Sequence, residues 1–236
     1  MWKSSSYEVI GRYHVKHGLP CQDKTRCLEK NGVHVIALAD GAGSAKDSEL
    51  GAAMAVETAS EFIATRFEDL YEEQDGQLVK LQIYEAVLDR LNQGSQQHRC
   101  QPSDLASTLL VAAVKDQRFL IAHIGDGVIG CLKNSSLSVA SFPQNGEFAN
   151  ETVFTTSSEA LSLMKVSKGE VADIEGFVLL SDGATASLYN PRERQLAAPI
   201  KELIQRSQPN FLKRVFDEFI VKRTTDDCSI AVMSRV

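Results

Sequence analysis

Apolar and polar positions along the chain predict strands and helices of ordinary length. Near the N-terminus, segments 8–14 and 33–39 are apolar or alternating and are bounded by Gly, Pro and Asn, a pattern typical of strands. From 48 to 71 the apolar residues recur with the helical period, and segment 77–93 shows the same period with its own apolar face. The first part of the chain is therefore predicted to hold two strands followed by two helices.

The second part begins with short strands separated by tight turns, which indicates an antiparallel meander. These strands are predicted at 107–114, 118–124, 128–133 and 137–142. Further along, the pattern predicts a short helix, two strands, two helices and a closing strand, at 157–164, 171–174, 176–181, 191–206, 209–222 and 228–235. Because strands and helices come in separate runs, the fold class is α+β, with layers of sheet and helix. The chain shows no internal repeat or long linker, so residues 1–236 are predicted to form a single domain.

Four acidic turns stand at the ends of the apolar runs. Asp40-Gly41, Asp126-Gly127 and Asp182-Gly183 each follow a predicted strand, and Asp226-Asp227 precedes the last one. A carboxylate at the end of a buried strand is costly to desolvate unless a cation meets it. One Asp-Gly pair alone is more often a simple turn than a ligand. Four such sites from distant segments together favour a metal cluster.

Divalent cations such as Mg²⁺ and Mn²⁺ prefer oxygen ligands and keep several bound waters. Two such ions, held about 3.5–4 Å apart by shared carboxylates, activate water and clamp a phosphoryl group for in-line attack. Glycine after an aspartate lets the backbone turn sharply and brings its carbonyl oxygen near an ion. The acidic turns therefore point to hydrolysis of phosphate esters.

The order and context of these residues resemble the metal-dependent protein phosphatases of the 2C type, in particular their short bacterial branch. The matching motifs span nearly the whole chain. They are Cys21-Gln22-Asp23, Ala39-Asp40-Gly41-Ala42-Gly43-Ser44, Ser107-Thr108-Leu109, Ile124-Gly125-Asp126-Gly127, Leu180-Ser181-Asp182-Gly183 and Asp226-Asp227-Cys228-Ser229-Ile230. The resemblance implies a four-layer α/β/β/α sandwich, in which two antiparallel sheets are flanked by helices and the metals occupy a cleft at one edge.

The resemblance also implies a role for each matching residue, with Mn²⁺ or Mg²⁺ as cofactor. Asp40 would bridge two ions, and Gly41 would lend its carbonyl oxygen. Asp182 and Asp226 would complete the shell of one ion, while Asp23 would support the other. Asp126 would help to hold a third, weaker ion.

The chain departs from the family pattern at several positions. Gln22 stands where a glutamate is common, which lowers the expected metal affinity. Ala42 replaces a histidine proposed as proton donor in animal members, and Gly18 stands where an arginine grips phosphate. Ala186 replaces a further aspartate, which weakens the expectation of a third ion.

The segment upstream of Gln22-Asp23 offers substitutes for the missing groups, namely His14, Lys16 and His17. We choose His14, at the end of the first predicted strand, as the catalytic general acid beside Asp40, because histidine titrates near neutral pH. The irregular stretch 143–152 is expected to overhang the cleft.

Three functions remain open at this point. The leading one is a serine/threonine phosphoprotein phosphatase that acts on phosphoserine or phosphothreonine proteins, with a cognate serine/threonine kinase as a further partner. The departures at Gln22, Ala42 and Ala186 favour a catalytically weak or inactive module that binds a phosphorylated partner or a kinase. A third possibility is a metallohydrolase of small phosphate esters.

Charge, hydropathy and cysteine content indicate the expected partners and cellular compartment, which is the cytoplasm. The net charge of −6 argues against non-specific nucleic acid binding. No apolar run reaches the roughly 18 residues that span a bilayer, and the N-terminus lacks the apolar core of a signal peptide. The five cysteines form no C-x-x-C pair and are expected to be free thiols, as in a reducing cytoplasm.

Overall fold

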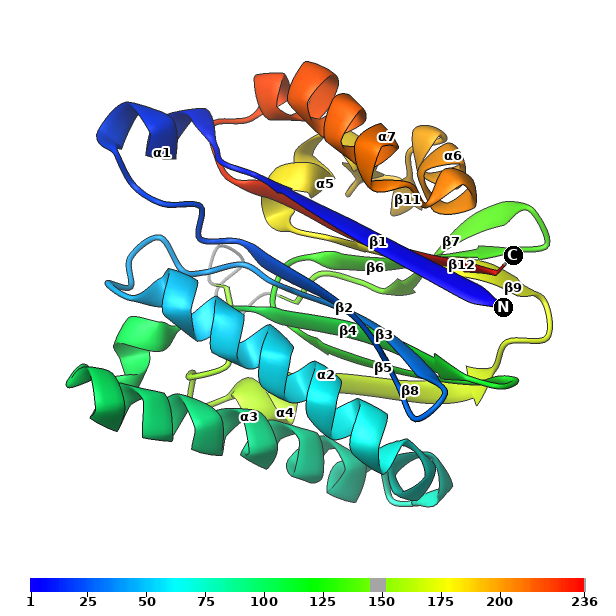
Figure 1. The fold of residues 1–236 in the computed structure, drawn as a ribbon, viewed down its shortest axis with the longest axis horizontal. Coiled ribbons are helices and arrows are strands. Elements are labelled where there is room, and N and C mark those ends of the chain that lie inside the picture. Colours follow the sequence, from blue (N-terminus) through cyan, green and yellow to red (C-terminus); the bar gives the residue numbers. More distant parts are fainter. Residues whose placement is uncertain (145–151, 236) are drawn as a thin grey trace.

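Two five-stranded antiparallel sheets lie face to face in the computed structural model, which describes residues 1–144 and 152–235 (Figure 1). The first sheet has the strand order β1-β12-β9-β6-β7, and the second has the order β2-β3-β4-β5-β8. The strands of the first sheet are β1 (Trp2–Val9), β6 (Val128–Lys133), β7 (Ser136–Ser141), β9 (Ile174–Leu180) and β12 (Cys228–Arg235). Those of the second are β2 (Lys24–Lys30), β3 (Val33–Ala39), β4 (Leu109–Lys115), β5 (Arg118–Ile124) and β8 (Lys165–Glu170).

Helices cover the outer face of each sheet and link the strands. The helices are α1 (Arg12–His17), α2 (Ser48–Glu72), α3 (Gly76–His98), α4 (Ala160–Leu163), α5 (Asp182–Leu188), α6 (Pro199–Arg206) and α7 (Pro209–Val215). A π-helical segment (Phe216–Ile220) and a 3-10 turn (Val221–Arg223) continue α7, and a second 3-10 turn spans Pro102–Leu105. A small hairpin of β10 (Tyr189–Asn190) and β11 (Gln195–Leu196) precedes α6.

The period-two alternation of the strands builds three apolar layers. On β3, Val35 and Ala37 pack against α2 and α3, whereas Ile36 and Leu38 face the other sheet. On β9, Phe177 and Leu179 meet the second sheet, while Val178 and Leu180 pack against α5, α6 and α7. The order of layers is therefore helices, sheet, sheet, helices (Figure 1), and the predicted four-layer α+β sandwich is confirmed.

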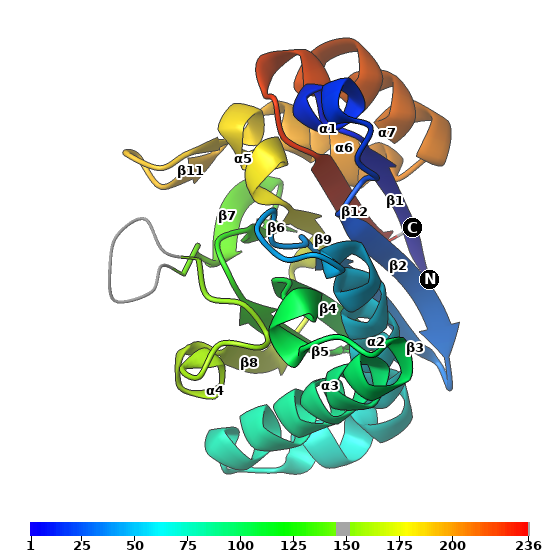
Figure 2. The same ribbon diagram turned by 90° about the vertical axis from the view of Figure 1, so that its left-hand side faces the viewer.

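The two sheets approach each other along one side, where the edge strands β1 and β2 meet. Glu8 of β1 accepts hydrogen bonds from the backbone N–H and the hydroxyl of Thr25 on β2. At the end of the sandwich toward the viewer in Figure 2, α1 lies beside the segment that leads into β12. Tyr13 N donates to Thr225 O at 2.9 Å, which fastens α1 to that segment.

Several predicted elements differ from the structure. The predicted strand 8–14 is wrong, because β1 ends at Val9 and His14 lies in helix α1 rather than at a strand end. The predicted strand 171–174 is wrong, because residues 171–173 connect β8, which was not predicted, to β9, which begins at Ile174. The predicted helix 191–206 begins only at Pro199, and its first part contributes to the β10–β11 hairpin. Strand β2 and helix α5 were not predicted, and the predicted helix 157–164 shrinks to α4.

Within residues 1–144 and 152–235, no helix combines the length and the apolar character needed to cross a bilayer.

Candidate active site

Asp40 stands directly after β3, where the chain leaves the buried sheet. Thr108, immediately before β4, holds the backbone of Asp40 by two hydrogen bonds. Thr108 Oγ1 accepts a hydrogen bond from Asp40 N at 2.9 Å, and Thr108 N donates to Asp40 O at 2.8 Å. At Gly41 a Cβ atom would come within 3.0 Å of the backbone of Gln22 and Ser48, so glycine allows this turn to pack closely. The turn therefore presents the Asp40 carboxylate from a fixed backbone.

Asp126 lies in the tight turn between β5 and β6. The preceding Gly125 has a φ of +113°, and a Cβ there would lie 2.5 Å from the Thr108 methyl group, so only glycine fits. Thr152 Oγ1 donates to Asp126 Oδ2 at 2.6 Å. This turn is thus packed against the same Thr108 that holds Asp40.

Asp182 is the first residue of α5 and is separated from β9 by Ser181 alone. Ser181 joins β9 to β12, since its Oγ accepts from Ser229 N at 2.9 Å. A Cβ at Gly183 would lie 2.0 Å from the carbonyl oxygen of Asp227, so glycine lets α5 begin against the Asp226-Asp227 segment. The backbone segments that carry Asp182 and Asp226 therefore lie next to each other.

These acidic residues line one cleft of about 170 Å³, although they come from four separate segments. The predicted site residues on its wall are His14, Asp40, Gly41, Asp126, Asp182 and Asp226. Gln22, Ala42 and Thr108 also line the cleft, together with Thr152 and Phe154 from the other side of the 145–151 gap. The geometry expected from the sequence, carboxylates of distant segments in one cleft, is thus present.

Asp23 lies beside this cleft rather than on its wall. Its side chain is fully buried, and within the described part of the chain neither carboxylate oxygen has a hydrogen-bond partner. Burial is the main cause that raises the pKa of Asp23 to about 7, and the nearby carboxylates of Asp227 and Asp182 contribute to this shift. A buried carboxyl group in this state stabilises the fold only if a cation or a proton offsets its charge.

The carboxyl groups on the wall also repel one another. Burial raises the pKa of Asp40 well above its usual range, and the charges of Asp23 and Asp182 add to the shift. Burial likewise raises the pKa of Asp182, and the charges of Asp126 and Asp226 add to that shift. One buried oxygen of Asp182, Oδ1, has no partner among the described residues.

This donor set fits hard divalent cations. The cleft offers several carboxylates and the Gly41 backbone as oxygen donors, with no histidine–cysteine set of the kind that zinc prefers among the residues on its described wall. The unpartnered oxygens of Asp23 and Asp182 are acceptors that lack a donor, and a cation or its bound water supplies what they lack. The residues present are therefore consistent with a site for two Mn²⁺ or Mg²⁺ ions.

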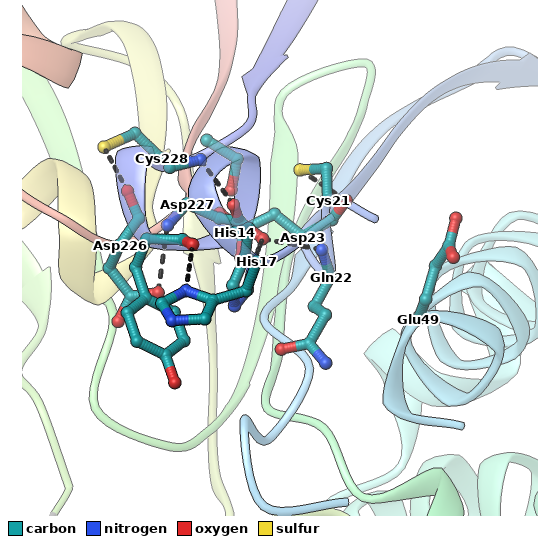
Figure 3. Close-up of polar contacts among 12 residues, drawn as sticks. His14, His17, Cys21, Gln22, Asp23, Glu49, Asp226, Asp227 and Cys228 are labelled. Atoms are coloured by element: carbon teal, nitrogen blue, oxygen red, sulfur yellow. Dashed lines mark hydrogen bonds and ion pairs between the residues drawn. The ribbon is translucent and has the colours of Figure 1, made fainter. Parts of the chain in front are cut away.

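His14 reaches the cleft from α1, a six-residue helix on which it is the only buried residue. Its Nδ1 lies 2.8 Å from Asp227 Oδ2, and both side chains are almost fully buried (Figure 3). Lys16 and His17 are exposed and do not line the cleft, and His17 Nδ1 instead meets Tyr13 O at 2.7 Å. Among the three candidates upstream of Gln22, the structure brings only His14 to the site.

The departures from the family pattern have visible consequences. Gly18 is the C-cap of α1 with a φ of +66°, a left-handed conformation in which arginine would be strained, so α1 ends where the family has its phosphate-gripping residue. Ala42 and Gln22 both line the cleft, whereas Ala186 is exposed on α5. The expectation that 143–152 overhangs the cleft concerns a stretch that lies largely outside the described residues.

Sequence reasoning missed the residues that hold the acidic ones in place. Thr108 grips Asp40, Thr152 binds Asp126, and Asp227 accepts from three donors near His14. In the sequence, Ser107-Thr108 shows only a family-like motif at the start of a predicted strand, with no sign of the contact to Asp40. For Asp227 the available signal was its place beside Asp226, because a second buried aspartate in one turn requires its own partners.

Comparisons with known proteins agree with this geometry. The family described as Protein phosphatase 2C matches residues 10–220. The chain is 25% identical over 247 residues to serine/threonine-protein phosphatase 3 of Escherichia coli K12, and the match covers 96% of this chain and 95% of the relative.

Two solved structures share the fold. A serine/threonine phosphatase of S. agalactiae superposes with a TM-score of 0.72 at 15% identity and full coverage of both chains. The catalytic domain of the phosphatase PstP, in complex with two manganese ions, gives a TM-score of 0.68 at 17% identity, over 99% of this chain and 97% of that one. The expected family and its enzyme class, protein serine/threonine phosphatase, are thereby confirmed, and the chain belongs to the protein phosphatase 2C family.

Proposed function

We propose that this protein is an active, metal-dependent phosphatase that removes phosphate from phosphoserine or phosphothreonine in proteins. The observation that carries the proposal is the cleft itself. Five aspartates from four distant segments line it, and a sixth, Asp23, lies buried beside it with both oxygens unpartnered among the described residues. Buried carboxylates this close together destabilise the fold when no cation offsets their charge, and with two divalent cations they form a site that can activate water and bind a phosphoryl group.

The proposed metal ligands are the residues to which the family resemblance gives that role, and all of them except Asp23 lie on the cleft wall. Asp40 would bridge two ions, with Gly41 contributing its carbonyl oxygen, and Asp182 and Asp226 would complete the shell of one ion. Asp23 would support the other ion, directly or through water, and Asp126 would hold a weaker third one. When bound, Mn²⁺ or Mg²⁺ would lower the pKa of a water and neutralise charge on the phosphate.

His14 is proposed as the general acid. The ester P–O bond breaks, its electron pair stays on the leaving serine or threonine oxygen, and that oxygen takes the proton from His14 Nε2. Phosphorus gains a bond to the oxygen of the attacking water, whose proton passes to solvent. His14 then recovers a proton from solvent. This role suits the position of His14 on the cleft wall, in a chain where Ala42 can supply no proton.

The proposed substrate is a protein phosphorylated by a serine/threonine kinase, and a cognate kinase is the expected partner in the cell. The relative from Escherichia coli is a serine/threonine-protein phosphatase by name, which supports this class of substrate. We also propose that residues 1–236 act as one domain, because strands of both sheets lead into the residues that line the cleft.

The direct test is turnover of a phosphoserine peptide and of para-nitrophenyl phosphate by purified protein with and without Mn²⁺. We expect turnover only with metal, and loss of it in Asp182→Ala. The matched control is Asp173→Asn, an exposed aspartate at the turn before β9, which should keep full activity. Turnover without metal, or undiminished turnover in Asp182→Ala, would contradict the proposal.

One alternative has a specific observation in its favour. Gln22 and Ala42 line the cleft where the family has a charged ligand and a proton donor, which would suit a module that binds a phosphorylated partner without hydrolysing it. This module would bind Mn²⁺ and a phosphoserine peptide yet release no phosphate. A preference for nucleotides over phosphopeptides would instead indicate a hydrolase of small phosphate esters.

A further inference from the structure

We propose that Asp227 is a positioning residue that holds His14 with its Nδ1–H against the Asp227 carboxylate, so that Nε2 is the nitrogen that gives a proton to the leaving group. The inference rests on the proposed phosphatase activity and deepens it, because it identifies what orients the general acid.

The Asp227 carboxylate is the meeting point of three segments that lie far apart in the sequence (Figure 3). Its Oδ2 lies 2.8 Å from His14 Nδ1 and accepts from Gln22 N at 2.6 Å, while Oδ1 accepts from Gly11 N at 2.6 Å. The Asp227 side chain is only 2% exposed, so water cannot replace these donors. One buried carboxylate therefore fixes α1, the Gln22-Asp23 segment and the Asp226 turn relative to one another.

The local backbone is shaped to allow this contact. A Cβ at Gly11 would lie 2.3 Å from the carbonyl carbon of Asp226, so only glycine lets the start of α1 approach the Asp226-Asp227 backbone. Two further bonds reinforce the approach, from Tyr13 N to Thr225 O and from Arg12 Nε to Thr224 O. The short helix α1 is thus held over this loop mainly by polar contacts.

The hydrogen-bond chemistry assigns the tautomer of His14. An ionised carboxylate is an acceptor only, and here it already accepts from two backbone N–H groups. The proton between Asp227 Oδ2 and His14 Nδ1 therefore belongs to Nδ1. Nε2 has no hydrogen-bond partner among the described residues, and the His14 ring lies on the cleft wall. It is the ring nitrogen left to exchange a proton in the cleft.

This orientation matters for the step proposed above. When Nε2–H gives its proton to the leaving oxygen, the ring remains as the neutral Nδ1–H form, and Asp227 is already placed to accept from it. With asparagine at position 227, one oxygen acceptor and one amide donor would face three donors, so at least one contact is lost or the ring changes tautomer.

The kinetic test compares substrates that differ in how much their leaving group needs a proton. Para-nitrophenolate leaves without one, whereas phenolate and the serine alkoxide depend on it. We expect His14→Gln to lower kcat for phenyl phosphate by about 10²-fold and kcat for para-nitrophenyl phosphate by less than tenfold. Asp227→Asn should show the same discrimination, and the double variant should be no worse than His14→Gln, because both act on one step.

A measurement on the metal-free protein tests the tautomer without reference to activity. Imidazole ¹⁵N chemical shifts should show neutral wild-type His14 protonated at Nδ1, whereas free histidine favours the Nε2–H form. In Asp227→Asn this preference should be lost. His17→Gln is the matched control, since His17 is exposed on the same helix, and it should change neither the spectrum of His14 nor the substrate discrimination.

The outcomes separate this inference from the proposed function. Absence of metal-dependent turnover in the wild type would overturn both. An active wild type whose Asp227→Asn variant loses both substrates equally, or in which His14 is protonated at Nε2, would overturn the inference alone and leave Asp227 a structural tie. A lower Tm in Asp227→Asn with unchanged discrimination would do the same.

Discussion

The burial of Asp23 predicts an unusual dependence of stability on pH in the metal-free protein. The side chain is fully buried, and neither of its oxygens has a partner among the described residues. Burial is the main cause of its raised pKa, from 3.8 to about 7, and the charges of Asp227 and Asp182 increase the shift. An exposed aspartate in the unfolded chain ionises near its ordinary pKa.

The sign of the effect follows from this difference. Below pH 4 the carboxyl group is protonated in both states and costs nothing. Between pH 4 and pH 7 the unfolded chain binds fewer protons than the folded one, so the free energy of unfolding falls as the pH rises. A difference of about three pKa units corresponds to about 4 kcal/mol, since each unit is worth about 1.4 kcal/mol. That is a large fraction of the 5–15 kcal/mol by which domains are commonly stable.

Urea unfolding of the metal-free protein at pH 5 and pH 8 measures this loss. We expect the wild type to be less stable at pH 8 by up to about 4 kcal/mol, and Mn²⁺ to restore stability at pH 8 by binding the folded state. Asp23→Asn carries no charge at position 23 and should lose less stability between the two pH values than the wild type; the loss that remains comes from Asp40 and Asp182, whose pKa values burial also raises. Asp173→Asn, which replaces an exposed aspartate, should follow the wild type.

The reasoning would be refuted by a metal-free wild type whose stability is constant or rises from pH 5 to pH 8. It would also be refuted if Asp23→Asn lost as much stability as the wild type, because the buried charge at position 23 would then not be the cause.

Three further predictions concern residues around the site and the second sheet. Gly11→Ala should lower the free energy of unfolding by about 1–3 kcal/mol and weaken Mn²⁺ binding in titration calorimetry, since the new methyl group would overlap the Asp226 backbone. Gly76→Ala is its control: the added methyl group would meet no atom within 4 Å, so this variant should not be destabilised. Gln22→Glu should raise Mn²⁺ affinity several-fold by adding a charge to the cleft wall, and an unchanged affinity would exclude this position from the metal shell. Lys168→Met should lower the free energy of unfolding in urea by about 1–3 kcal/mol, because the Lys168 ammonium group donates hydrogen bonds to carbonyl oxygens at the C-terminal end of α2, among them Leu70 O at 3.1 Å and Tyr71 O at 2.9 Å. This variant should keep its activity.

The sequence was most informative where strands are buried on both faces. β3 and β9 are almost continuous apolar runs, so both strands, with an acidic turn at the end of each, could be predicted. β1 was misplaced because its Ser-rich sequence gives little apolar contrast on an edge strand. α1 has only six residues, too few to show a helical period, and its polar contacts with the Asp226 turn come from the far end of the chain.

The same limit applies to the site. Asp40, Asp126, Asp182 and Asp226 each follow or precede a strong strand signal, so their meeting in one cleft could be predicted. The hydrogen bond between His14 and Asp227 joins residues 213 positions apart. Nothing in either local segment indicates this contact, because it depends on how the first sheet places β12 beside β1.

Anomalous diffraction from crystals of the wild-type protein soaked in Mn²⁺ tests the central claim most directly. We predict two strong peaks in the cleft, about 2 Å from their ligand oxygens. One should be shared by Asp40, Asp182 and Asp226, and the other should lie between Asp40 and the Gly41 carbonyl on the side of Asp23. No peak in the cleft, or a single one elsewhere, such as among Asp47, Cys100 and Asp104, would contradict the account.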